Sequence, residues 1–165
     1  MATIVAIPAA ATLLEQVDPR PRDHVAADVT RLRAAIDGLD FTGADVAVLV
    51  VQGASGVTVA GQAGLAGYGY PDVQLPLTPA VATAGALAGH LGVDVSVADE
   101  LDAEFGVLAL QVAARVDVPV VAVSVDDDLP MIGAVVQALR EVASTSRLAV
   151  VGAGPRAAPH TGPPP

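Results

Sequence analysis

A serine in a glycine-rich turn is the first side chain of this sequence whose surroundings could do chemistry. Ser55 stands in Gly53-Ala54-Ser55-Gly56, directly after an apolar run of strand length, and superficially resembles the turn that presents a nucleophilic serine in hydrolases. That turn requires the spacing G-x-S-x-G and a histidine base, and no histidine is expected in a loop at the same edge of the sheet. The sequence therefore favours an ordinary turn at Ser55.

Three consecutive aspartates form the second group with chemical potential. Asp126, Asp127 and Asp128 could offer oxygen ligands to a hard cation. However, Asp128 directly precedes Leu129 and Pro130 at an expected helix start, where an aspartate accepts backbone hydrogen bonds and its charge suits the helix dipole. N-capping explains these aspartates more simply than metal binding does.

The three histidines provide the sharpest test of a metal hypothesis. His24 falls early in one expected helix, His90 in the last turn of another, and His160 near the end of the chain. They share no ligand spacing, and a site of two histidines and one carboxylate would need two of them to converge. Gly152-Ala153-Gly154 similarly looks like the opening of a dinucleotide-binding motif but is followed by prolines instead of a helix. The spacing predicts neither a metal site nor a nucleotide site.

The elements that must position these residues follow from the hydrophobic pattern. The continuous apolar run from Val46 to Val51 is typical of a strand covered by helices on both faces. Six glycines between Gly53 and Gly69 predict mainly turns and loop there, with a short strand at 57–60. Further strands are expected at residues 3–7, 73–75, 93–97, 118–123 and 147–152, and helices at 22–38, 79–90, 102–115 and 129–144.

This order of elements predicts an α/β fold, namely a three-layer domain with a mostly parallel central sheet flanked by helices. Residues 1–153 form a single domain on this interpretation, and the Pro/Gly-rich tail 154–165 is expected to be disordered. Removing the tail should change stability by less than about 0.5 kcal/mol. Because sites in open parallel sheets lie beyond the carboxyl ends of strands, the segments to search are 8–12, 52–56, 124–128 and 152–156.

Composition excludes several partners and chemistries. Eight Lys and Arg against eighteen Asp and Glu give a net charge of −10, which disfavours nucleic acid and anionic membranes as partners. The absence of cysteine excludes disulfides and thiolate chemistry, and a cytoplasmic location is expected. The opening segment lacks the basic residues of a signal peptide, and no apolar stretch is long enough to span a bilayer.

Several longer stretches resemble small actinobacterial proteins of the class III extradiol ring-cleavage dioxygenase B-subunit-like superfamily. The stretches that carry the resemblance are Ile7-Pro8-Ala9-Ala10, Val50-Val51-Gln52-Gly53, the run from Leu65 to Leu77 (LAGYGYPDVQLPL), Leu101 to Leu108 (LDAEFGVL) and Leu148 to Arg156 (LAVVGAGPR). The resemblance implies an α/β fold. In active members it implies Fe(II) held by two histidines, which follow the first two long strands, and by a later glutamate, with a further histidine as acid and base.

The positions that the resemblance makes functional carry other residues in this chain. Ala9 and Gln52 occupy the two ligand positions, and Ala103, beside Asp102, occupies the acid/base position. The later glutamate has no counterpart, since the sequence ends at Pro165 where full-length dioxygenases continue. Alanine can neither ligate iron nor carry a proton, so the resemblance implies that the iron chemistry is lost and that no cofactor is bound.

The sequence thus suggests a non-catalytic binding or interaction domain for a small molecule or a protein, in which self-association stays open. Candidate pocket-lining residues are Gln52, Gly53, Ser55, Asp102 and Glu104. The alternative is an active ring-cleavage oxygenase or hydrolase whose site is unorthodox or shared with another subunit.

Overall fold

A computed structural model of the chain describes residues 2–7, 23–113 and 117–153. Several expectations fall outside these residues: the candidate segment 8–12 with Ala9, the part of the candidate segment 152–156 beyond Ala153, the end of the expected helix 102–115, the disorder of the tail 154–165, and the place of His160.

The strands form two sheets. β1 (Ala2–Ile7), β2 (Val46–Gln52), β3 (Gly56–Ala60), β6 (Val95–Ala98), β7 (Val120–Val125) and β8 (Leu148–Ala153) make a six-stranded sheet in the order β1-β8-β2-β7-β3-β6. All neighbours in it are parallel except β3 and β7, which are antiparallel. β4 (Gln62–Leu65) and β5 (Tyr70–Pro76) form a separate antiparallel pair, joined by the short 3-10 helix η2 (Ala66–Tyr68).

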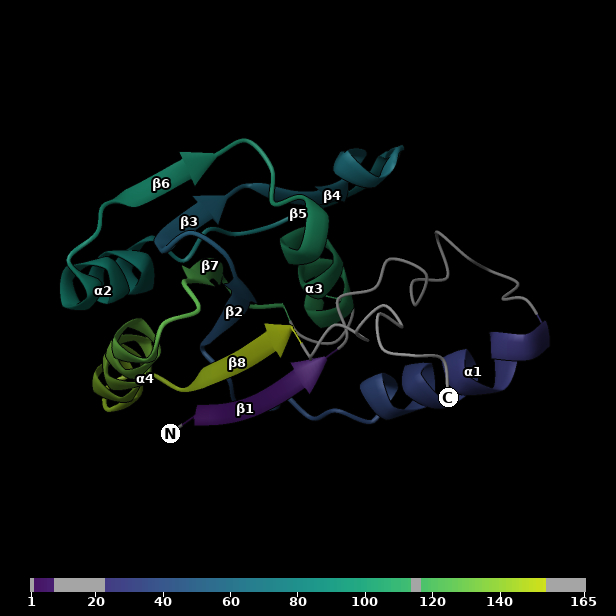
Figure 1. The fold of residues 1–165 in the computed structure, drawn as a ribbon, viewed down its shortest axis with the longest axis horizontal. Helices are drawn as coiled ribbons and strands as arrows, with labels where there is room; N and C mark the ends of the chain where they lie inside the picture. The colour runs from purple at the N-terminus through teal and green to yellow at the C-terminus, as the bar shows by residue number, and fades with distance from the viewer. Residues whose placement is uncertain (1, 8–22, 114–116, 154–165) are drawn as a thin grey trace.

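Helices cover both faces of the larger sheet. Figure 1 shows α2 (Val81–Leu91) and α4 (Leu129–Ala143) on one side of it, and α1 (Asp23–Asp37) and α3 (Ala103–Ala113) on the other. The alternation of side chains along the strands feeds one apolar core on each side. The three-layer α/β class predicted from the sequence is confirmed.

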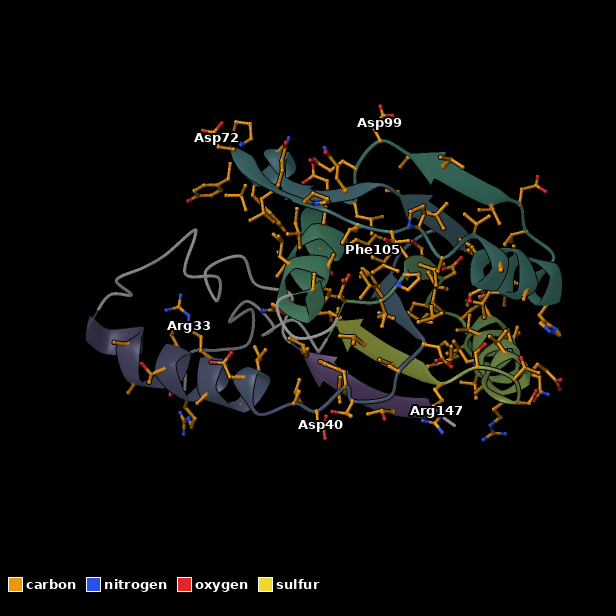
Figure 2. The ribbon with its side chains drawn as sticks, turned by 180° about the vertical axis from the view of Figure 1, so that it is seen from behind. Arg33, Asp40, Asp72, Asp99, Phe105 and Arg147 are labelled. Carbon is orange, nitrogen blue, oxygen red and sulfur yellow. The ribbon has the colours of Figure 1, made fainter. Side chains whose placement is uncertain are left out.

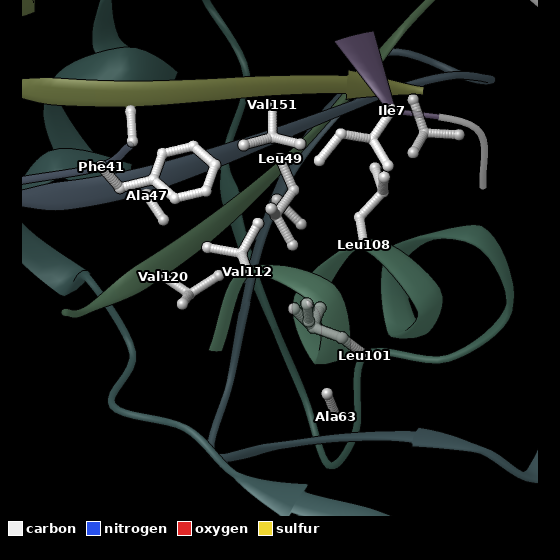
Figure 3. Packing of buried hydrophobic residues seen from close by; sticks show 14 of the residues in the cluster. Ile7, Phe41, Ala47, Leu49, Ala63, Leu101, Leu108, Val112, Val120 and Val151 are labelled. Carbon is white, nitrogen blue, oxygen red and sulfur yellow. The ribbon is translucent and has the colours of Figure 1, made fainter. Parts of the chain in front are cut away.

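The two cores share the central strands β2 and β7. Val48 pairs with Val121 in the parallel register, and both side chains are fully buried beneath α2 and α4. On the opposite face Ala47, Leu49 and Val120 belong to one core with residues of α1 and α3. Figure 3 shows part of this core from close by, including Leu108 and Val112 of α3. The expectation that Val48 and Val121 lie on neighbouring, doubly covered strands is confirmed.

The glycine-rich segment from Gly53 to Gly69 contains more regular structure than expected. The predicted strand at 57–60 exists as β3, but the segment also holds β4 and η2, so the expectation of loop up to Gly69 is wrong. The reason is tertiary: β4 pairs with β5 and packs against α3, and Gly64 donates its N–H to the carbonyl of Leu101 at 2.9 Å. Gly69 adopts a left-handed conformation with φ of 84° after η2, which glycine tolerates without strain.

Helix ends follow the local signals. Gly92, with φ of 68°, caps the C-terminus of α2 as the sequence predicts. Asp128 caps α4, because its Oδ1 accepts a hydrogen bond from the backbone N–H of Met131 at 2.7 Å. Of the helices in the described ranges, none combines the length and apolar character needed to cross a bilayer.

Candidate functional site

The carboxyl ends of four parallel strands meet at one edge of the sheet. β1, β8, β2 and β7 run in the same direction, so the segments that follow β2 and β7 become neighbours there. The backbone N–H of Gly53 donates to the carbonyl of Val125 at 2.9 Å, and the N–H of Asp126 donates to Ser55 Oγ at 3.4 Å. Two of the segments selected from the sequence, 52–56 and 124–128, are therefore in contact.

The turn at Ser55 has a structural role. After β2 the chain crosses the end of β7 and returns as β3, which pairs with β7 from Gly56 onward. Ser55 lies in this crossing and its hydroxyl accepts the hydrogen bond from Asp126. This placement agrees with the interpretation of Gly53-Ala54-Ser55-Gly56 as an ordinary turn.

A cavity of about 630 Å³ opens beside this edge, between α4 and the sheet. We call it the α4 groove. Its floor is formed by β1, β8 and β2, and its wall is formed by α4. The lining residues are Ile4, Val5, Ala6, Val50, Gln52, Val125, Asp126, Asp127, Ile132, Val135, Val136, Leu139, Val150 and Gly152.

The groove is open because the two helices on this face, α2 and α4, do not cover the full width of a six-stranded sheet. Ile4 on the edge strand β1 is 74% exposed, and Ile132 and Val136 on α4 are 40% and 44% exposed. α4 carries apolar residues at 132, 135, 136 and 139, a spacing that makes a stripe wide enough to face both the core and the groove. Val135, by contrast, is buried and belongs to the core.

Polar groups are confined to one end of the groove. Gln52 ends β2, and Asp126 and Asp127 follow β7. All three side chains are exposed and contribute an amide and two carboxylates at the carboxyl edge. Among the described residues that line the groove, none carries a positive charge. Arg147 precedes β8 and therefore lies at the opposite edge of the sheet (Figure 2).

The five residues selected from the sequence fall in two places. Gln52 lines the groove, and Gly53 and Ser55 lie in the crossing turn that follows it. Asp102 and Glu104 lie at the start of α3 on the other side of the sheet and are not part of the groove lining. The structure thus brings the first three together and separates them from the last two.

Asp102 is engaged in backbone hydrogen bonds. Its Oδ2 accepts from the N–H of Gly67 at 2.8 Å, and its Oδ1 accepts from the N–H of Ala103 at 2.7 Å. The carboxylate therefore ties η2 to the first turn of α3. Glu104 is half-buried in that same turn.

The residues present do not fit the iron site that the resemblance implies. Gln52 lies in the groove, whereas Ala103 begins α3, and Ala9 falls outside the described residues. The helix that carries His24 packs on the opposite face of the sheet from the helix that carries His90. In the part of the chain that the structure describes, no three His, Cys, Asp or Glu side chains gather closely enough to share a metal ion.

Sequence reasoning missed the apolar part of the groove. Ile4, Ile132, Val136 and Leu139 were not among the selected residues because each fits an ordinary strand or helix pattern. The available signal was the width of the apolar stripe on α4, which exceeds what one buried face needs. That β1 is an edge strand with an apolar outer face depends on the strand order, which the sequence does not show.

The fold and the groove together define a class: a doubly covered α/β domain with an open, mostly apolar groove at the carboxyl edge of its sheet. A scan against models of known protein families gives no match, and no curated protein matches the chain.

Proposed function

We propose that this domain binds a small molecule in the α4 groove without transforming it. The single observation that carries the proposal is the groove itself: about 630 Å³ of mostly apolar lining with three polar side chains gathered at one end. Small-molecule sites typically measure about 300–1,000 Å³ and combine apolar walls with a few placed polar groups. The ligand has an apolar body and one polar head.

The position of the groove supports the same function. In open α/β sheets, ligands bind beyond the carboxyl ends of the strands. Gln52, Asp126 and Asp127 stand at those ends, where a ligand head reaches them while its body lies between Val50, Val150 and α4. Apolar surface buried in this way contributes roughly 25 cal/mol per Å² before the costs of association.

The absence of catalysis is part of the proposal and rests on residue chemistry. The resemblance to extradiol dioxygenases assigns iron and proton chemistry to positions held here by Ala9, Gln52 and Ala103. The carboxylate of Asp102, which adjoins the acid/base position, accepts hydrogen bonds from two backbone N–H groups. We also place the domain in the cytoplasm, a proposal supported by the absence of cysteine.

Titration with a neutral naphthylamine dye, whose fluorescence rises in apolar surroundings, tests the groove. The wild-type chain should bind the dye saturably. Ile132→Glu places a charge on the groove wall at a position already 40% exposed, and it should raise the dye Kd by about tenfold. The control is Val81→Glu, the same kind of change on α2 at a residue 63% exposed and outside the groove lining, which should leave the Kd unchanged.

Equal dye binding by the wild type and Ile132→Glu would reject the groove as the site. Metal analysis of the purified chain tests the second part of the proposal. Near-stoichiometric iron, with an oxygen-consuming activity that disappears when the iron is removed, would establish the alternative function of an active oxygenase.

A further inference from the structure

We infer that the head group recognised at the polar end of the α4 groove is a primary ammonium, so that the ligand is an amphipathic amine. This inference rests on the proposed function and adds the chemical class of the ligand. Its evidence is the charge and the hydrogen-bonding capacity of the three polar side chains at the end of the groove.

The polar end of the groove carries negative charge. Asp126 and Asp127 are both exposed and adjacent in sequence, and the described lining offers them no cationic side chain. The net charge of −10 adds a long-range attraction for cations. An anionic head such as a carboxylate would meet two like charges at this end and would be repelled.

The N-terminus of α4 does not cancel this charge. A helix terminus carries an effective charge of about +0.5, which is less than the charge of one carboxylate. Asp128 already lies at that terminus and accepts the N–H of Met131 at 2.7 Å. The terminus is therefore compensated by its own cap, while Asp126 and Asp127 line the groove.

Hydrogen-bond counting selects a primary ammonium among the cations. An ammonium group has three N–H donors, and the end of the groove supplies two carboxylates and the amide oxygen of Gln52 as acceptors. A quaternary ammonium has no donor to use with them and is usually held over aromatic rings. The described lining contains no aromatic side chain.

The apolar part of the groove fits the remainder of such a ligand. Val50 and Val150 lie on adjacent strands, and Ile132, Val136 and Leu139 face them from α4. A hydrocarbon chain that runs between these surfaces would cover part of Ile4, which is 74% exposed on β1. Apolar contact would supply most of the affinity, and the carboxylates would select the head.

Competition against the bound dye by three amphiphiles of equal chain length tests the inference. Octylammonium, 1-octanol and octanoate differ only in the head, and octylammonium should compete best by at least about tenfold over octanoate. The double variant Asp126→Asn/Asp127→Asn should lose that preference. Raising the ionic strength from about 0.01 M to about 1 M should weaken octylammonium and leave 1-octanol unaffected.

The control variant is Asp99→Asn, which removes the same kind of charge from an exposed side chain that points away from the domain (Figure 2). It should keep the full preference for octylammonium. If the dye binds but the three amphiphiles compete equally, or octanoate competes best, the ammonium inference is overturned while the proposed function stands. If neither dye nor amphiphile binds, and sedimentation shows a dimer that Ile132→Glu dissociates, a second copy of the chain fills the groove and both proposals fail.

Discussion

A close contact between two glycines allows α3 to pack tightly against β4. Gly106 lies in the second turn of α3, and its Cα faces the carbonyl of Gly64 in β4 so closely that a methyl group added at Gly106 would overlap that oxygen. The same methyl group would lie 3.0 Å from the carbonyl oxygen of Leu101. Both atoms belong to the backbone, which cannot move aside as the end of a side chain can.

We expect Gly106→Ala to lower the free energy of unfolding by about 1–3 kcal/mol, because α3 must shift away from β4 to admit the methyl group. Urea unfolding followed by circular dichroism measures the change. The matched control is Gly133→Ala in α4, where an added methyl group meets nothing within 4 Å. Alanine should stabilise that helix by about 0.5–1 kcal/mol, and a similar response of both variants would contradict the close packing.

At the scale of the element, α4 joins the core to the groove. Its buried residues Val135, Ala138 and Val142 pack on the sheet, while Ile132 and Val136 extend the apolar stripe into the groove. Its N-terminus is set by Asp128 and by Pro130 in the first turn. The same short segment thus begins the helix and supplies the carboxylates at the polar end of the groove.

Asp128→Ala should lower the free energy of unfolding by about 1 kcal/mol, since it removes the acceptor for the N–H of Met131. Thermal unfolding of the wild type and of the Asp128→Ala variant measures the change. Asp127→Ala serves as the control, because it removes an equal charge from the same helix end without removing that hydrogen bond. If both substitutions cost the same, charge and not capping would be the contribution of Asp128.

At the scale of the whole molecule, stability depends on the strands that helices cover on both faces. β2 and β7 lie inside the sheet and contribute residues to both cores. β6, in contrast, is an edge strand whose Val97 is 83% exposed. The same substitution should therefore be severe on β2 or β7 and nearly neutral on β6.

Val48→Asp should prevent folding, because Val48 is fully buried and a carboxylate there would have no partner. The cost of several kcal/mol is comparable with the total stability of a small domain. Val121→Asp on the neighbouring strand should behave alike. Val97→Asp, the same change on β6, should alter stability by less than about 0.5 kcal/mol. A soluble Val48→Asp protein with unchanged melting behaviour would contradict the doubly covered sheet.

Local pattern was sufficient for most elements of this fold. The run from Val46 to Val51 indicates a buried strand because only residues covered on both faces are apolar at every position. Asp128 and Gly92 mark helix ends because capping depends on residues close in sequence. The segments 52–56 and 124–128 could be selected in advance because parallel strands place their carboxyl ends at a common edge.

Tertiary structure alone decided the remainder. β4 forms within a glycine-rich segment because β5 and α3 supply partners that no local pattern reveals. Asp102 and Glu104 are separated from Gln52 because α3 lies on the opposite side of the sheet from α4. The α4 groove exists because the strand order makes β1 the outermost strand of the sheet, where α4 does not cover it. Strand order depends on contacts between residues far apart in the chain.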